Sequence, residues 1–348
     1  MSSSGTPPDD GPVGVTEDPP PPVTEPTPLG VPGRPGTGTF TIEGRATPGL
    51  FVVGWLATLT GFVVVAIGIL SGGGLRATIL LLIGLVLLSI GLVAAAGSQG
   101  IERRTRAALG YRGPSPFLVF AAAVPISLLA VIVLSVPLVA LGMDVDGPVA
   151  ALLSVTLQAI VYVGLVRLLV VDTGALDWRS MGIVPLDRRG IVELGGGALW
   201  AVPVIFVTAI VAQLLLNLFP VTPVSPLPPT GTTAGFIVSL VAGVLVAPFG
   251  EEILFRGFAT TAWARGMGAR RALVVGSLFF AFAHVVTIAG ATAGDALGLA
   301  AVAFAGRIPV ALALGWLFLR RGTIWAPFGL HAAFNGILLL VAEAYPPL

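Results

Sequence analysis

Long apolar stretches recur along this chain from Gly49 onward, and they predict helices that cross a membrane. Most of them have about 18 to 25 residues, and a helix of that length spans a hydrocarbon core about 30 Å thick. We expect nine spans, at about residues 50–70, 77–97, 117–142, 149–171, 195–219, 233–264, 272–290, 295–319 and 324–343. The predicted fold class is therefore all-α, a polytopic transmembrane helical bundle.

The chain before the first span has a different composition. Residues 1–46 are crowded with Pro, Gly, Ser and Thr, as in DPPPPVTEPTP and VPGRPGTG, and they offer almost no periodic apolar face. Such a segment cannot bury a core, so we expect a disordered Pro-rich arm. Residues 47–115 are predicted to form an N-terminal transmembrane pair with a basic loop, and residues 116–348 the bundle that carries the chemistry.

Composition narrows the function classes. Hydrophobic residues make up 55% of the chain and charged residues 10%, with a mean hydropathy of +0.99. Soluble proteins carry about 25% charged residues, so the expected surroundings are a lipid bilayer. The net charge of +1 leaves no basic field for nucleic acid, and no nucleic-acid partner is expected. The chain has no Cys, which excludes disulfides, thiolate metal sites and Cys nucleophiles.

Arginines orient the predicted spans. They gather between spans two and three, four and five, six and seven, and eight and nine: Arg103, Arg104, Arg106, Arg112, Arg179, Arg188, Arg189, Arg265, Arg270, Arg271, Arg320 and Arg321. Cytoplasmic loops carry the excess of basic residues, and nine spans allow all four loops to lie on that side together with the N-terminal arm. The prediction is an integral, multi-pass protein of the plasma membrane with a cytoplasmic N-terminus.

The sixth span runs without a turn signal into charged residues, in the segment APFGEEILFRGF. An ionised side chain near the bilayer centre costs about 2.5 to 3.5 kcal/mol on insertion scales, so such residues mark functional sites. Glu252 and Arg256 are four residues apart and are expected to pair on one helix face, while Glu251 points about 100° away. The pair alone is equally consistent with holding helices together. The unpaired Glu251 favours function.

The only two histidines of the chain also lie in predicted spans. His284 follows Phe280 by four residues in FFAFAHVV, and His331 precedes Asn335 by four residues in GLHAAFNGI, on one helix face. A lone membrane His is usually a hydrogen-bonding group between helices. Counted from the Arg-marked borders, however, Glu251 and both histidines lie about 12 to 20 Å deep along their helices. We expect them to meet in one cavity that opens to the cytoplasm.

Two kinds of water activation fit these residues. Glu251 could serve as a general base with a histidine assisting, or Glu251, His284 and His331 could bind Zn²⁺, which activates its bound water. His331 and Asn335 could instead donate hydrogen bonds to a developing oxyanion. No organic cofactor is expected.

Three ordered motifs carry a specific resemblance: EExxxR (Glu251, Glu252, Arg256), FxxxH (Phe280, His284) and HxxxN (His331, Asn335). Together they resemble the CPBP family of intramembrane proteases, which takes in the type II CAAX prenyl endopeptidases, the bacteriocin-processing and immunity proteins, and the Abi proteins. The resemblance covers about residues 149–348, and strictly only the motifs. It implies a CAAX-type endopeptidase, a metalloprotease or glutamate-dependent protease, that acts on a membrane-associated peptide or protein.

The same resemblance implies roles for single residues. Glu251 would be the catalytic glutamate and His284 its partner in activating water. His331 and Asn335 would complete the site, as metal ligands or as an oxyanion hole. Glu252 and Arg256 would hold these side chains in position without contacting the substrate.

Other interpretations stay open. Arg307 in the eighth span is either a counter-ion for the glutamates or a contact for a substrate carboxylate. Ser277, seven residues before His284, offers a weaker Ser–His alternative that lacks a GxSxG setting. A non-catalytic immunity or scaffold protein of the same family is a second function, and a proton-coupled transporter is a third. A transporter would need a repeated half, and no second copy of the motifs occurs.

Overall fold

The computed structural model describes residue 42 and residues 44–105, 110–219, 221, 229–286 and 288–345. All regular elements among these residues are helices, which confirms the all-α class. Residues Arg45–Leu348 group into one compact unit. The predicted N-terminal arm, residues 1–46, lies almost wholly outside the described residues.

The helices follow one another with few interruptions. They are α1 (Pro48–Leu70), α2 (Gly74–Arg104), α3 (Pro116–Ala140), α4 (Pro148–Val166), η1 (Arg167–Val171), α5 (Arg188–Leu199), α6 (Ala201–Leu218), α7 (Thr233–Leu240), η2 (Val241–Val246), α8 (Ala247–Glu251), η3 (Glu252–Thr260), α9 (Thr261–Met267), α10 (Ala269–Ala283), α11 (Ala293–Arg321) and α12 (Trp325–Ala344), where η marks a π-helix. Within the described part of the chain, eight helices or joined helices are long and apolar enough to cross a membrane. The chain is thus an integral, multi-pass membrane protein.

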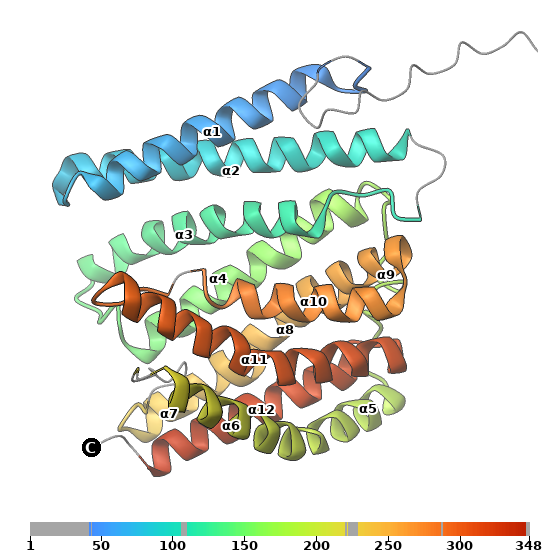
Figure 1. The fold of residues 1–348 in the computed structure, drawn as a ribbon. Helices are drawn as coiled ribbons and strands as arrows, with labels where there is room; N and C mark the ends of the chain where they lie inside the picture. The colour runs from blue at the N-terminus through green and yellow to red at the C-terminus, as the bar shows by residue number, and fades with distance from the viewer. Residues whose placement is uncertain are drawn as a thin grey trace, which may run out of the picture. The chain divides into compact units, whose positions relative to one another are not determined.

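Successive crossings run in opposite directions, so the arginine-bearing loops come together at one end of the bundle (Figure 1). The backbone N–H of Ile324 donates to the Gly182 carbonyl at 3.0 Å, which ties the loop after α11 to the loop after η1. Gly110, in the loop after α2, lies against the backbone carbonyl of Arg265 in α9. The expected grouping of these loops on one side is confirmed, whereas their assignment to the cytoplasm stays a prediction.

The sixth predicted span is one continuous helix, residues 233–267, but two stretches of it, η2 and η3, are π-helical. In a π-helix the backbone bonds skip one residue more than in an α-helix, from i to i+5. The hydroxyl of Thr260 follows the same spacing and donates to the Phe255 carbonyl at 2.8 Å. Such stretches are rare and frequently mark functional sites. Here η3 contains Glu252 and Arg256, two of the residues singled out by the sequence.

The seventh predicted span, residues 272–290, is wrong in its second half. The helix α10 has 15 residues and ends at Ala283, so it extends about 22 Å, less than the roughly 30 Å core. The β-branched residues Val285, Val286 and Ile288 follow it, and such residues have modest helix propensity. His284 is consequently the residue that ends a helix, where the sequence had placed it well inside one.

Aromatic side chains lock η3 to its neighbours. Phe255 of η3, Phe279 and Phe280 of α10, and Phe120 of α3 pack with ring centroids 5.1 to 5.9 Å apart. Trp263 of α9 adds an edge contact to Phe279 at 5.3 Å. Aromatic pairs of this kind contribute about 0.5 to 1.5 kcal/mol each beyond the area they bury. This cluster holds the helix of Glu251 and the helix of His284 in a fixed relation.

The first two helices pack by a different means. Gly54 and Gly61 in α1, and Gly84 and Gly91 in α2, are spaced by seven residues, so each pair lies on one helix face. A Cβ on Gly61 would lie 2.6 Å from the backbone nitrogen of Leu88, and the other three positions are similarly tight. Small residues let membrane helices approach until their backbones touch. Figure 1 shows α1 lying along α2, and α2 along α3.

Candidate active site

Three helices bring the predicted polar residues together. Glu251 and Glu252 come from the junction of α8 and η3, His284 from the end of α10, and His331 from the second turn of α12. The side chain of Glu252 is completely buried, whereas those of Glu251 and His284 are 16% and 26% exposed. The group therefore has a sealed side and an accessible side.

Glu252 is the acceptor at the sealed side. Its Oε1 accepts hydrogen bonds from Arg256 Nη1 at 3.0 Å and from His331 Nδ1 at 2.8 Å. The expected ion pair of Glu252 with Arg256 is confirmed. The bond to His331 adds a constraint that spacing alone does not reveal. Because Nδ1 carries the proton and donates a hydrogen bond to the carboxylate, the neutral imidazole of His331 has its lone pair on Nε2.

His284 is oriented by its own helix. Its Nδ1 lies 2.8 Å from the backbone carbonyl of Phe280, one of the last-turn carbonyls that a helix end leaves without a partner. A carbonyl can only accept, so Nδ1 carries the proton, and the neutral ring again has its lone pair on Nε2. The residue that ends α10 is thereby held in one tautomer and one direction.

Glu251 lies where the two imidazoles converge. Its Oε2 is 3.6 Å from Nε2 of His284 and 3.8 Å from Nε2 of His331. Both separations are too long for hydrogen bonds, and this buried oxygen has no hydrogen-bond partner among the described residues. The three atoms that face one another are acceptors when the histidines are neutral. A donor or a cation between them is needed to satisfy all three.

Phe280 links the charged residues to the histidines. The guanidinium of Arg256 lies over its ring at 4.0 Å from the centroid, a cation–π arrangement. The rings of His284 and His331 lie 4.4 and 5.8 Å from the same centroid. The FxxxH motif thus supplies both the ring on which Arg256 rests and the carbonyl that orients His284.

Asn335 is placed beside the group but bonds elsewhere. Its Nδ2 donates to the backbone carbonyl of Gly243 in η2 at 2.8 Å, which ties α12 to the first π-helical stretch of the long helix. One of the two amide N–H bonds is used in this way. The sequence did not predict this role of Gly243, because no residue pattern indicates that a π-helix presents a carbonyl to a neighbouring helix.

Two other sequence candidates do not join this group. The hydroxyl of Ser277 is buried and has no hydrogen-bond partner among the described residues, so no Ser–His pair is formed. Arg307 donates from Nη1 to the carbonyl of Ala303 in its own helix at 2.9 Å. No carboxylate of the described residues lies within ion-pair distance of it.

The donor types suit zinc, because imidazole nitrogens and a carboxylate oxygen are common zinc ligands. Their arrangement does not form a ready coordination shell. Among the residues that the structure describes, no three His, Asp or Glu side chains are grouped closely enough to hold a metal ion. Zinc binding at this group therefore stays a prediction.

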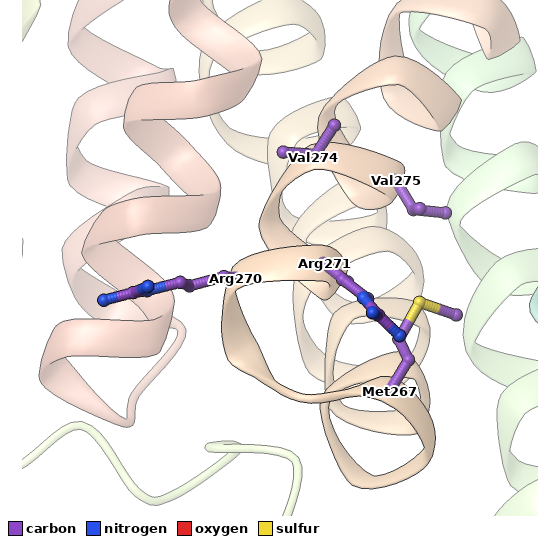
Figure 2. A pocket seen from close by; sticks show the side chains of 5 residues that line it. All are labelled: Met267, Arg270, Arg271, Val274 and Val275. Atoms are coloured by element: carbon purple, nitrogen blue, oxygen red, sulfur yellow. The ribbon is translucent and has the colours of Figure 1, made fainter.

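A surface hollow lies apart from the Glu–His group, at the turn between α9 and α10. It has a volume of about 390 Å³ and is lined by Met267, Arg270, Arg271, Val274 and Val275. Figure 2 shows the side chains of Arg270 and Arg271 extending to opposite sides of α10. None of these residues belongs to the group around Glu251.

Comparison with known proteins identifies the part of the chain that carries this group. Residues 233–337 match the family described as Type II CAAX prenyl endopeptidase Rce1-like. The chain has no significant match among curated proteins or among solved structures. The matched region begins with α7, ends within α12 and contains all three motifs, while α1 to α6 lie outside it. The resemblance to CPBP intramembrane proteases is confirmed over residues 233–337, which are similar to the type II CAAX prenyl endopeptidase Rce1-like family.

Proposed function

We propose that this chain is an intramembrane endopeptidase that hydrolyses a peptide bond of a membrane-associated protein or peptide. The observation that carries the proposal is the convergence of Glu251 Oε2 with the two Nε2 atoms of His284 and His331. A water molecule has two protons, so between these three acceptors it can donate to Glu251 Oε2 and to one imidazole Nε2. The site accordingly holds the nucleophile of a hydrolysis between a base and an imidazole.

In the proposed reaction Glu251 removes a proton from the water while the oxygen attacks the carbonyl carbon of the scissile peptide bond. The tetrahedral intermediate then collapses, and the C–N bond breaks. The proton taken by Glu251 passes to the leaving nitrogen, directly or through His284. The products are a carboxylic acid and an amine, which exchange a proton to give a carboxylate and an ammonium group, so one water molecule is consumed and Glu251 is restored.

The developing oxyanion needs donors. The second amide N–H of Asn335 is not engaged by Gly243, and His331 becomes a donor at Nε2 when that atom is protonated. Removal of one oxyanion donor lowers kcat by about 10² to 10³ in other hydrolases. Glu252 and Arg256 act only as positioning residues, through His331 and Phe280.

Cleavage by the purified full-length chain in lipid nanodiscs tests the proposal. Suitable substrates are a peptide that ends in a prenylated Cys followed by three residues, and an unprenylated transmembrane peptide. Glu251→Gln and His284→Ala are each expected to lower kcat by about 10²- to 10⁴-fold, the usual contribution of a general base. Glu193→Gln, which alters the ion pair with Arg321 outside the Glu–His group, is the matched control and should cleave normally. Equal cleavage by all of these variants contradicts the proposal.

Metal analysis of the same preparation separates the two water-activation routes. We expect an active enzyme with much less than one bound zinc per chain, and unchanged cleavage after treatment with a chelator. A stoichiometric metal whose removal abolishes cleavage would replace the Glu–His mechanism by a metal-dependent one. The peptidase assignment would survive that result.

The orientation of the chain in the membrane can be tested directly, because the chain has no native Cys. We propose that the arginine-rich end is cytoplasmic and that the cavity opens there. A Cys placed by Arg270→Cys should react with an impermeant maleimide only from the cytoplasmic side, and one placed by Ser71→Cys only from the other side. Labelling of Glu251→Cys from the side of Ser71 would contradict the cytoplasmic opening.

A further inference from the structure

Arg307 is a charged residue in the middle of a membrane-spanning helix to which the proposed chemistry gives no task. It lies at the midpoint of α11. One and two turns further along the same helix face, Ala311 and Leu314 are only 1% and 0% exposed, so this face turns to the interior of the bundle. A central arginine costs about 2.5 to 3.5 kcal/mol on insertion scales and commonly marks a substrate path.

The guanidinium of Arg307 is underused. It has five N–H donors, and its hydrogen bond within the described residues goes to Ala303 of its own helix. Oε1 of Glu252 already accepts from Arg256 and His331, and no ion pair joins Glu252 to Arg307 among the described residues. Glu251 lies within electrostatic range of Arg307 but forms no ion pair with it. Arg307 is thus close to the reacting group without being bonded to it.

The surroundings of Arg307 leave room for a ligand. Residues 303–309 are all half-buried, in contrast to the sealed pocket of Glu252. A Cβ built on the adjacent Gly306 would meet no atom within 4 Å. The neighbouring helix α10 stops at Ala283, so it does not accompany α11 along its full length. A half-buried cation beside open space, in an otherwise apolar helix, is suited to an anionic group brought in by another molecule.

We propose that Arg307 binds the C-terminal carboxylate of the substrate, an inference that rests on the peptidase function proposed above. A guanidinium and a carboxylate form two parallel charge-assisted hydrogen bonds. An apolar peptide segment has no charged side chains, so the carboxylate of its free C-terminus is the negative charge that it always carries. An extended chain spans about 3.3 to 3.6 Å per residue, so a carboxylate at Arg307 sets the cut near Glu251 a few residues before the chain end.

Two peptides that differ only at the C-terminus test this binding. One ends in a free carboxylate and the other in a carboxamide, and kcat/KM is measured for both with the full chain in nanodiscs. A hydrogen-bonded charge is expected to favour the free acid by about 10- to 100-fold. Arg307→Gln should reduce this preference to less than about twofold, mainly by raising KM for the acid. Arg307→Lys should keep part of it, because Lys retains the charge but not the planar fork.

The matched control is Arg270→Gln, which removes an arginine of the surface hollow and should keep the wild-type preference. A third peptide, with a carboxamide end and an Asp side chain as its last residue, separates the sources of the carboxylate. If this peptide is cut as well as the free acid in an Arg307-dependent way, a side-chain carboxylate is the ligand and the proposal is overturned. An equal preference in wild type and Arg307→Gln overturns it as well.

Peptide affinities measured on an inactive variant test the role of Arg307 independently of cleavage. The affinities of the acid and amide peptides are measured on Glu251→Gln and on Glu251→Gln combined with Arg307→Gln. The single variant should bind the acid more tightly by the same factor, and the double variant should bind both peptides equally. If the wild type cuts neither peptide, the peptidase function fails while these affinities still decide the role of Arg307. If it cuts both equally, the function stands and the carboxylate site falls.

Discussion

Helices α1 and α2 are held together by a different kind of contact from the helices around Glu251. Gly54, Gly61, Gly84 and Gly91 bring the backbones of α1 and α2 into contact. In contrast, Glu252 joins η3 to α12 through the hydrogen bond from His331, beside the bond that it accepts from Arg256 of its own helix. Lipid tails are as apolar as Leu side chains, so membrane helices need either close packing or polar bonds to associate. Close packing fixes only how near two helices lie. The polar network also fixes which atom of His331 faces Glu251.

The largest effect should come from breaking the polar network on one side. Arg256→Met leaves the buried carboxylate of Glu252 without its cation, and loss of one partner of a buried pair destabilises proteins by about 3 to 5 kcal/mol. We expect a similar decrease in the free energy of unfolding in bicelles. The double variant Glu252→Gln/Arg256→Met should recover most of this stability. If the single and double variants are equally unstable, the instability does not come from the unpaired carboxylate of Glu252.

A smaller effect should follow from crowding the glycine contact. In Gly91→Ala the new methyl group meets the backbone of Thr58, and overpacking of this kind costs about 1 to 3 kcal/mol. Thermal unfolding measures the loss. Gly97→Ala on the same helix is the control, because its Cβ meets only Leu50 Cδ2 at 3.7 Å.

The same variant tests whether the first two helices only adhere to the bundle. Cleavage by folded Gly91→Ala should stay within about threefold of wild type, a factor that corresponds to well under 1.4 kcal/mol. A loss of activity as large as that caused by Glu251→Gln would show instead that α1 and α2 take part in forming the site.

The smallest change in stability should come from Asn335→Leu, which removes the hydrogen bond to Gly243 at nearly constant size. The expected loss is about 0.5 to 1.5 kcal/mol. Gln213→Leu, which removes an exposed bond to Asn217 in α6, is the matched control and should be close to neutral. A kcat of Asn335→Leu that equals that of wild type would remove this residue from the proposed oxyanion hole.

The sequence predicted most of the spans and the ion pair of Glu252 with Arg256, because both depend on local signals. Apolar run length finds a membrane helix, and four-residue spacing pairs Glu252 with Arg256. Run length could not find the end of α10, because the residues after His284 are as apolar as those before it. The ring directions of His284 and His331 depend on a carbonyl and a carboxylate that only the folded bundle places beside them.

The π-helix η3 restricts how this chain can change in length. A ring closed on the fifth residue holds one residue more than a ring closed on the fourth. Deleting one residue, such as Ala259, would remove the residue that the wider turn accommodates and would let the segment relax towards an α-helix. Side chains within the segment would then change direction, and Phe255 would lose its contacts with Phe279 and Phe280. Insertions and deletions should be accepted in the loops, whereas within residues 252–260 the number of residues is itself part of the site.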